Sequence, residues 1–296
     1  MNTTGPRMAV VGTIGGWSSE LLADTVGRLT GQRLLVDMEE VRADLDSGQV
    51  WYRGVDLATM DGLMIKKIGA RYSPLLLDRL EILRYLESRG TRVFSSPEAI
   101  IRVLNRLTCT VTMRMAGIPM PPTTITESVD EAIEAVGMYN QAVFKPLYTS
   151  KGRGMCVIAD NGQCAEKIRD YHRDNAIMYI QQMIDLNGRD LGIVFLGGKY
   201  VTTYARCSTD GSAWNTTTVS GGKYEACDPL PESIEVAERA QALFGLEFTC
   251  VDVVETSRGP MVFEVSAFGG FRGILEARGL DAAELYAKHV LGRLGA

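Results

Sequence analysis

The sequence has few of the residues that build several common kinds of site. It contains 2 histidines among 296 residues, His172 and His289, so a histidine-based metal site or catalytic triad is not expected. Its 6 cysteines are scattered without a C-x-x-C pair, which argues against a zinc site and against a disulfide framework. Free cysteines fit a reducing compartment, and we therefore expect a cytoplasmic protein.

Long apolar runs and an excess of positive charge are also missing. No segment approaches the roughly 20 apolar residues that a membrane-spanning helix requires. The strand-like residues 8–11 near the N-terminus are too few for a signal peptide. A formal net charge of -5 provides no basic field for nucleic acid or for an anionic membrane, and neither is expected as a partner.

With 46% hydrophobic residues the chain can bury a sizeable core, and its 296 residues are enough for two or three modest domains. The first hundred residues alternate between strand and helix signals, which predicts a small parallel-sheet domain. The strands are expected at residues 8–11, 33–37, 62–66 and 91–94, and the helices at 18–29 and 75–88. A further helix is expected to begin after Ser96 and to continue to Met115.

The loop at residues 12–19 joins the first predicted strand to the first predicted helix. Such a loop could present backbone N–H groups to an anion. It matches neither G-x-G-x-x-G nor the Walker pattern, so a plain turn capped by Ser18 or Ser19 is the favoured interpretation.

Two acidic residues near the C-terminus are the most informative feature. Asp252 and Glu264 flank a turn signal, and a turn centred on Arg258 places them opposite each other on one face of a hairpin. Facing carboxylates about 5 Å apart repel each other. A cation between them reverses the sign, and hard Mg²⁺ suits carboxylate oxygens. A hairpin with a solvated acidic side explains this segment equally well. The face is also predicted to carry Val254, Val262 and Ser266.

A polar, glycine-rich loop is the second informative pattern. A strand ends at Lys145, residues 148–154 read YTSKGRG, and another strand follows. This loop can fold as a flap over phosphates, with Lys151 and Arg153 as cations. The alternative is the basic tip of an ordinary hairpin.

Three segments, in this order, resemble the ATP-grasp enzymes and are most similar to the RimK-type carboxylate-amine ligases: VFKPLYTSKGRGM, YIQQMIDLNGRDLGIVFLGG and CVDVVETSRGPMVFEVSAFGG. The phrases KKIGARYSP, ARCSTDGSAWNTTT and FEVSAFGGFRG are also similar to the ATP-grasp member of the GAK gene system. The resemblance covers essentially the whole chain and implies the α+β ATP-grasp fold. It implies an N-terminal βα domain at residues 1–96, a connecting helix at 97–118, a lid domain at 119–184 and a C-terminal domain with the metal site at 185–296.

The resemblance also implies roles for individual residues. For ATP it implies phosphate contacts, a hinge against adenine, and Asp190 near the ribose; the residues are Arg106, Lys145, Thr149, Ser150, Lys151, Gly152, Arg153, Gly154, Gln182, Met183, Ile184 and Asp190. For one or two Mg²⁺ ions, which Mn²⁺ could replace, the implied ligands are Asp252, Glu264 and Ser266. Arg206, Asn215 and Arg272 are the implied catalytic residues, the first two facing the transferred phosphoryl group.

Three positions depart from the family pattern. Arg106 stands where the family usually has an ATP-binding lysine, which keeps the charge but changes its shape. Ser266 stands where the third metal ligand is generally asparagine, so one ion is expected to bind weakly or to keep a water there. Gln182 replaces the usual glutamate of the hinge and should leave backbone recognition of adenine intact.

The implied reaction is the ATP- and Mg-dependent joining of a carboxylate to an amine through an acyl phosphate, with release of ADP and phosphate. A kinase and a non-catalytic nucleotide sensor remain as alternatives. The two substrates, whether small molecules, peptides or protein termini, are not identified by the sequence, and a homo-oligomer stays open. Lys66, Lys67, Arg71 and Arg272 could hold an acidic substrate, while solvent-facing cations explain the two lysines equally well. Arg272 is favoured because it follows the predicted metal strand closely.

Overall fold

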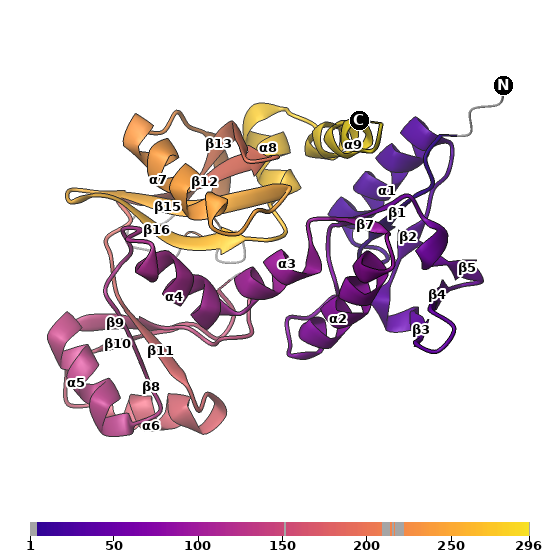
Figure 1. Cartoon of the computed structure of the whole chain (residues 1–296). Helices are drawn as coiled ribbons and strands as arrows, with labels where there is room; N and C mark the ends of the chain where they lie inside the picture. The colour runs from indigo at the N-terminus through magenta and orange to yellow at the C-terminus, as the bar shows by residue number, and fades with distance from the viewer. Residues whose placement is uncertain (1–4, 151, 209–213, 215, 217–221, 296) are drawn as a thin grey trace.

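The computed structural model describes residues 5–150, 152–208, 214, 216 and 222–295. Three main sheets follow one another along the chain, with helices packed against each of them (Figure 1). One sheet is parallel and two are antiparallel, which agrees with the predicted α+β class. The predicted domain limits at residues 96, 118 and 184 stay a prediction.

The N-terminal sheet has the parallel strand order β2-β1-β6-β7 that the βα alternation predicts. Its strands are β1 (Met8–Val11), β2 (Leu35–Val36), β6 (Gly62–Ile65) and β7 (Arg92–Phe94), and its helices are α1 (Trp17–Thr30) and α2 (Leu75–Ser88). Between β2 and β6 lies a region without a sequence prediction. It holds the short sheet β3 (Arg42–Asp44), β4 (Gln49–Tyr52) and β5 (Val55–Asp56), and the 3-10 helices η1 (Met38–Glu40) and η2 (Leu57–Thr59).

Two expectations for the N-terminal part are wrong. The helix predicted from residue 97 to Met115 is divided into α3 (Pro97–Leu104) and α4 (Arg106–Met115). Asn105 has an extended backbone, and its side chain accepts a hydrogen bond from the N–H of Thr108, so it caps a new helix. Helix α1 is capped by Gly16 without a side-chain bond, and not by Ser18 or Ser19, because Ser19 Oγ instead accepts from the N–H of Thr13 at 3.1 Å.

The middle sheet is antiparallel, with strand order β10-β9-β11-β8. Its strands are β8 (Thr123–Thr126), β9 (Gln141–Phe144), β10 (Cys156–Ala159) and β11 (Met178–Gln182), and its helices are α5 (Val129–Tyr139) and α6 (Cys164–Asp174). Alternate residues of β9 and β11, including Phe144 and Ile180, are buried under both helices. The loop that predicts a flap connects β9 to β10.

The C-terminal sheet is antiparallel, with strand order β14-β13-β12-β15-β16. Its strands are β12 (Arg189–Leu196), β13 (Lys199–Cys207), β14 (Lys223–Ala226), β15 (Phe248–Thr256) and β16 (Gly259–Ser266). The helices of this part are α7 (Pro231–Ala242), α8 (Phe271–Arg278) and α9 (Ala282–Leu294). Helix α7 covers one face of the sheet, where Val236 and Ala240 join a core with Val251 and Val265. The residues on the other face of β15 and β16 are not covered by α7 and point toward the interior of the molecule.

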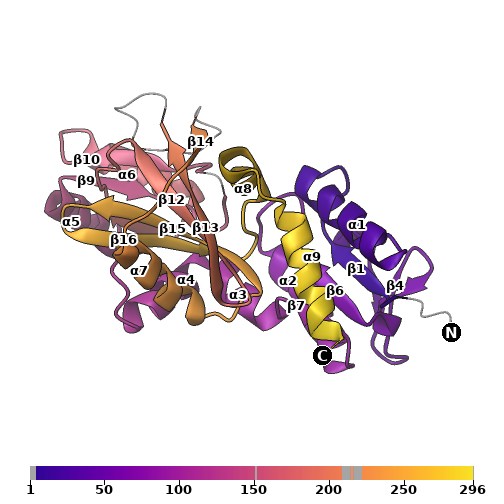
Figure 2. The same cartoon turned by 90° about the horizontal axis from the view of Figure 1, so that it is seen from above.

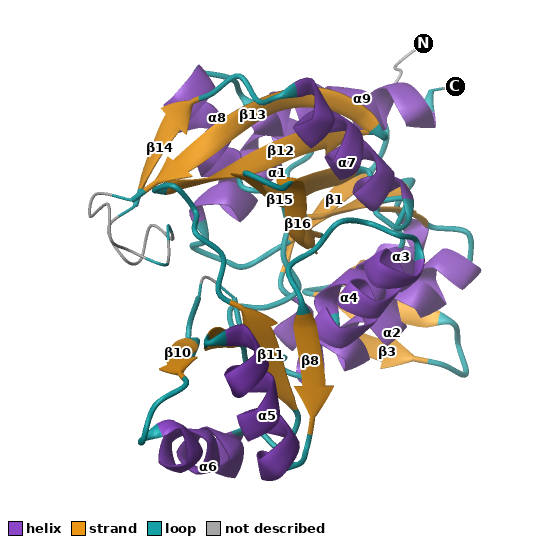
Figure 3. Ribbon diagram, turned by 90° about the vertical axis from the view of Figure 1, so that its left-hand side faces the viewer, coloured by secondary structure: helices purple, strands orange, loops and turns teal. Residues whose placement is uncertain are grey.

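The parts are joined by packing as well as by the chain. Figure 2 shows α9 alongside α1, and Arg28 of α1 contacts Glu284 of α9 at 2.6 Å. Figure 3 shows the middle sheet with α5 and α6 at one end of the molecule, the five-stranded sheet at the other, and α3 and α4 beside them. Within the described residues, no helix combines the length and the apolar character needed to cross a membrane.

Candidate active site

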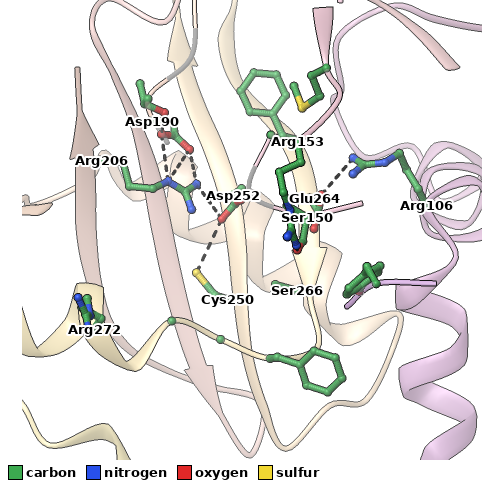
Figure 4. Close-up of a pocket in the computed structure, with 18 of the residues that line it drawn as sticks. Arg106, Ser150, Arg153, Asp190, Arg206, Cys250, Asp252, Glu264, Ser266 and Arg272 are labelled. Carbon is green, nitrogen blue, oxygen red and sulfur yellow. Dashed lines mark hydrogen bonds and ion pairs between the residues drawn. The ribbon is translucent and has the colours of Figure 1, made fainter. Parts of the chain in front are cut away.

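A cavity of about 830 Å³ lies where the three parts meet. Its walls come from the loop before α1, the end of β6, α4, the β9–β10 loop, the end of β11, and the strands β12, β13, β15 and β16. Most of the predicted site residues that the structure describes line it. Figure 4 labels these lining residues: Arg106, Ser150, Arg153, Asp190, Arg206, Cys250, Asp252, Glu264, Ser266 and Arg272.

Asp252 and Glu264 are direct cross-strand partners, as the sequence predicts. The register shifts just beyond them, because Val253 pairs with Val262 and leaves Phe263 as the extra residue of a β-bulge. The prediction that Val262 shares the face of Asp252 is therefore wrong, since Val262 is buried in the core under α7. Phe263 lines the cavity beside Glu264 instead.

Asp252 belongs to a partly buried charge cluster on neighbouring strands. Arg206 Nη2 lies 2.9 Å from Asp252 Oδ1, and the same guanidinium forms hydrogen bonds to both carboxylate oxygens of Asp190. The hydroxyl of Thr216 also donates to Asp190. Burial raises the pKa of Asp252 to about 6; Arg206 opposes this rise, while Asp190 and Glu264 add to it. Arg206 alone therefore does not balance the negative charges of Asp190, Asp252 and Glu264.

Arg106 ties the second carboxylate to the glycine-rich loop. Its Nη1 donates to Glu264 Oε2 at 3.2 Å, its Nη2 to the carbonyl of Thr149 at 3.3 Å, and its Nε to the carbonyl of Pro146 at 3.2 Å. Arg106, the first residue of α4, therefore positions both the carboxylate of Glu264 on β16 and the base of the predicted flap. This cation is supplied by the same break at Asn105 that the sequence analysis missed.

Lys145 lies at the end of β9 with its ammonium inside the cavity wall. It donates to Gln181 Oε1 at 2.5 Å and lies 5.1 Å from the centre of the Phe263 ring. Burial lowers its pKa to about 7, and Arg106 adds to the shift, whereas Glu264, Asp252 and Asp190 oppose it. An anion placed against this ammonium would favour its charged form.

This environment predicts that nucleotide binding takes up protons at pH 8. Free Lys145 is then mostly neutral, and a phosphate beside it raises its pKa, so binding of a non-hydrolysable ATP analogue with Mg²⁺ should take up most of one proton. Titration calorimetry in buffers of different ionisation enthalpy measures this number. The uptake should disappear in Lys145→Met; an equal uptake in that variant would contradict the assignment.

Not all of the predicted site residues lie in the cavity wall. Those that line the cavity are Arg106, Lys145, Ser150, Gly152, Arg153, Gln182, Met183, Ile184, Asp190, Arg206, Asp252, Glu264, Ser266 and Arg272. Thr149 and Gly154 are described but are not part of this lining. The prediction that the loop closes over the phosphates stays a prediction. Lys151 and Asn215 lie outside the described residues.

Several lining residues were not predicted, among them Trp17, Gln181, Tyr204 and Thr216. Among these, Tyr204 packs closely against two glycines. A Cβ on Gly192 would lie 2.4 Å from Tyr204 Cζ, and a Cβ on Gly273 would lie 2.7 Å from its Cε2. Such spacing is too close for any side chain, so these two glycines allow the ring to fill the space between the sheet and α8.

The donor set fits a magnesium ion shared with a nucleotide. No group of three histidine, cysteine, aspartate or glutamate side chains suited to a metal occurs among the described residues, so the protein alone does not form a closed cage. Mg²⁺ is commonly held by one or two carboxylates together with substrate phosphates and waters. Asp252 and Glu264 would supply the carboxylates, and the cavity would supply the room for phosphates.

Comparisons with known proteins agree with this geometry. The family of RimK-like ATP-grasp domains matches residues 103–290. Tetrahydromethanopterin:alpha-L-glutamate ligase from Methanosarcina acetivorans is 28% identical over 262 residues, which are 79% of this chain and 81% of that protein. Ribosomal protein bS6–L-glutamate ligase from Salmonella paratyphi B is 29% identical over 241 residues, 80% of this chain and 78% of that protein.

Solved structures show the same fold. A RimK domain ATP-grasp protein from Sphaerobacter thermophilus superposes with a TM-score of 0.74 at 21% identity, covering 96% of this chain and 98% of that one. The ATP-grasp ligase PsnB, solved with a minimal precursor, gives a TM-score of 0.74 at 17% identity over 98% and 99% of the two chains.

The fold and the paired carboxylates thus define an ATP-grasp protein. More particularly, the chain belongs to the RimK-like ATP-grasp family. It is an ATP-dependent ligase that joins a carboxylate to an amine, which confirms the predicted class of enzyme. No comparison tests the likeness to the GAK system.

Proposed function

We propose that this ligase activates a carboxylate as an acyl phosphate in the cavity described above and then transfers the acyl group to an amine. The observation that supports this most directly is the pairing of Asp252 and Glu264 in one wall of a cavity that also holds Lys145, Arg153 and Arg206. Acids that hold a cation and bases that face phosphates are what phosphoryl transfer requires.

The residue roles follow from position. Asp252 and Glu264 would hold Mg²⁺, which neutralises charge on the nucleotide phosphates, with Ser266 beside them and Mn²⁺ as a possible substitute. Lys145, Arg106 and the loop from Thr149 to Gly154, of which Ser150, Gly152 and Arg153 line the cavity, would contact the phosphates. Gln182, Met183 and Ile184 would lie against adenine. Asp190 is held by Arg206 and Thr216, so a ribose contact would require it to exchange one of these partners. A solved neighbour, PsnB, carries Mg and ADP.

The chemistry needs no protein nucleophile. A carboxylate oxygen attacks the γ-phosphorus of ATP, the bond from that phosphorus to the β–γ bridging oxygen breaks, and ADP leaves. The amine, after losing its ammonium proton to solvent, attacks the acyl carbon, and phosphate departs as the amide forms and the second amine proton is lost. Arg206 and Arg272 would stabilise the charge on the transferred phosphoryl group. A closed site is needed because water would hydrolyse the acyl phosphate.

The amine substrate that we propose to test first is glutamate. Both curated relatives described above are glutamate ligases by name. The two names give different acceptors for glutamate. For this chain we therefore propose only that the acceptor carboxylate belongs to a small molecule, a peptide or a protein terminus.

Trapping with hydroxylamine tests this function. Candidate carboxylic acids are incubated with the protein, Mg²⁺ and ATP, first with hydroxylamine and then with glutamate. We expect one acid to yield a hydroxamate together with stoichiometric ADP. A stable phosphorylated product would instead indicate a kinase, and stabilisation by Mg-ATP without ADP release would indicate a nucleotide sensor.

A further inference from the structure

Lys66 is a buried cation that the roles above do not use. It follows β6, its residue is 3% exposed, and it lines the cavity. Its ammonium donates to the carbonyl of Gly269 at 2.7 Å and lies 3.4 Å from that of Phe268 and 4.0 Å from the centre of the Phe271 ring. No ion pair joins it to a carboxylate anywhere in the described part of the chain.

The surroundings of Lys66 favour an anion. Burial lowers its pKa well below the ordinary value and the neighbouring Lys67 adds to the shift, while Cys250 opposes it weakly. A buried charge is costly when it is unpaired. A negative group delivered by a ligand would therefore gain a strong interaction here.

Helix α8 begins beside this ammonium, and helix α1 begins next to α8. Gly16 precedes α1 and Gly270 precedes α8, neither helix has a side-chain cap, and both glycines line the cavity. The two ends lie next to each other, since the Arg272 guanidinium is 5.2 Å from the centre of the Trp17 ring. Helix N-termini attract anions, so they add to the field of Lys66, although the Glu20 carboxylate already occupies the N–H of Gly15.

The position of Lys66 relative to Asp252 and Glu264 suggests how far a carboxylate bound by Lys66 would lie from a group that reacts beside the acidic pair. Lys66 donates to the carbonyl of Gly269, and a Cβ on Gly269 would lie 3.5 Å from the backbone carbonyl carbon of Thr249, three residues before Asp252 on β15. Three residues of a strand span about 10 Å. A carboxylate near Lys66 would thus be one short molecule away from a group reacting near Asp252.

We propose that Lys66 binds the non-reacting carboxylate of a small, doubly acidic substrate and determines the preference for that substrate over its neutral amide. This inference rests on the proposed function, because it presumes that the reacting group lies beside Asp252 and Glu264. Arg272, which is the residue favoured by the sequence, is 59% exposed in its side chain and paired with Glu276 at 3.8 Å, so it is a weaker anchor than Lys66.

The test compares binding of acids and their monoamides. Titration calorimetry with Mg²⁺ and a non-hydrolysable ATP analogue would use L-glutamate against L-glutamine, L-aspartate against L-asparagine, and glutarate against its monoamide. We expect the wild type to bind at least one acid about tenfold or more tightly than its amide, and Lys66→Met to reduce that ratio to about twofold or less. The Kd for the ATP analogue should be unchanged.

Two further variants make the result specific. Lys66→Gln removes the charge but can still donate to the carbonyl of Gly269, so it separates charge from a structural hydrogen bond and serves if Lys66→Met does not fold. Lys199→Met removes an exposed lysine on β13 and should keep the preference of the wild type.

The proposal is overturned if the wild type binds no acid better than its amide, or if the preference survives in both Lys66 variants. Because the readout is binding, it is independent of the hydroxamate experiment: an absent hydroxamate with a retained acid preference refutes only the acyl-phosphate chemistry.

Discussion

Replacing Asp252 by asparagine is expected to lower ADP release by about a thousandfold or more while the protein stays folded. A metal ion contributes several kcal/mol of transition-state stabilisation in phosphoryl transfer, and about 4 kcal/mol corresponds to a thousandfold. Asparagine keeps the size of the side chain but removes the charge that binds the ion. Glu264→Gln should have the same effect, since the two residues are direct cross-strand partners.

The Asp252→Asn variant is expected to be at least as stable as the wild type at pH 7. The folded-state pKa of Asp252 is raised from 3.8 to about 6, so between these values the folded protein binds more protons than the unfolded chain. Stability from this group therefore falls as pH rises through that window, and at pH 7 the buried carboxylate is destabilising. Asparagine removes that penalty, so the melting temperature should stay equal or increase.

The measurements are ADP release with the substrates identified by trapping, and thermal unfolding of each variant. Glu238→Gln on the outer side of α7 is the matched control, because Glu238 is exposed and α7 covers the opposite face of the sheet. Full turnover in both Asp252→Asn and Glu264→Gln would refute the assignment of the metal site.

The second large effect is expected for Arg206→Met, which should lower the free energy of unfolding by about 3–5 kcal/mol. Burial on its own would lower the pKa of Arg206, but Asp190 and Asp252 raise it well above the ordinary value. The side chains of Asp190 and Asp252 are 7% and 23% exposed. Without the guanidinium the buried carboxylate of Asp190 and the partly buried carboxylate of Asp252 are left uncompensated, and ADP release should also be lost.

Urea unfolding measures this change, and Arg189→Met is the matched control. Arg189 lies at the start of β12, its side chain is 49% exposed, and it pairs with Glu255 at 3.2 Å, so its loss should cost less than about 1 kcal/mol. Mg²⁺ should stabilise Arg206→Met more than the wild type, because it supplies the missing positive charge. An Arg206→Met protein as stable as the control would show that the cluster is not held together by this cation.

The sequence predicted those elements whose signals are local. Strand β1 and helix α2 were located to the residue, because an apolar run or a helical repeat bounded by turn residues defines them without help from the rest of the chain. The break at Asn105 was missed because apolar residues at helical spacing continue on both sides of it, although asparagine before a helical segment is itself an N-cap signal. The bulge at Phe263 was missed because one extra residue in a strand leaves the alternating pattern readable in two registers.

The acidic pair and the basic loop could be recognised along the chain, since strand pairing across a short turn is governed by residues close in sequence. Their partners could not. Arg106 reaches Glu264 across 158 residues, and Lys66 reaches Gly269 across 203. Burial, and with it the pKa values of Asp252, Lys145 and Lys66, depends on which distant surfaces exclude water from a side chain. That exclusion exists only once the three sheets have packed together, so the charge balance of the cavity is a property of the tertiary structure.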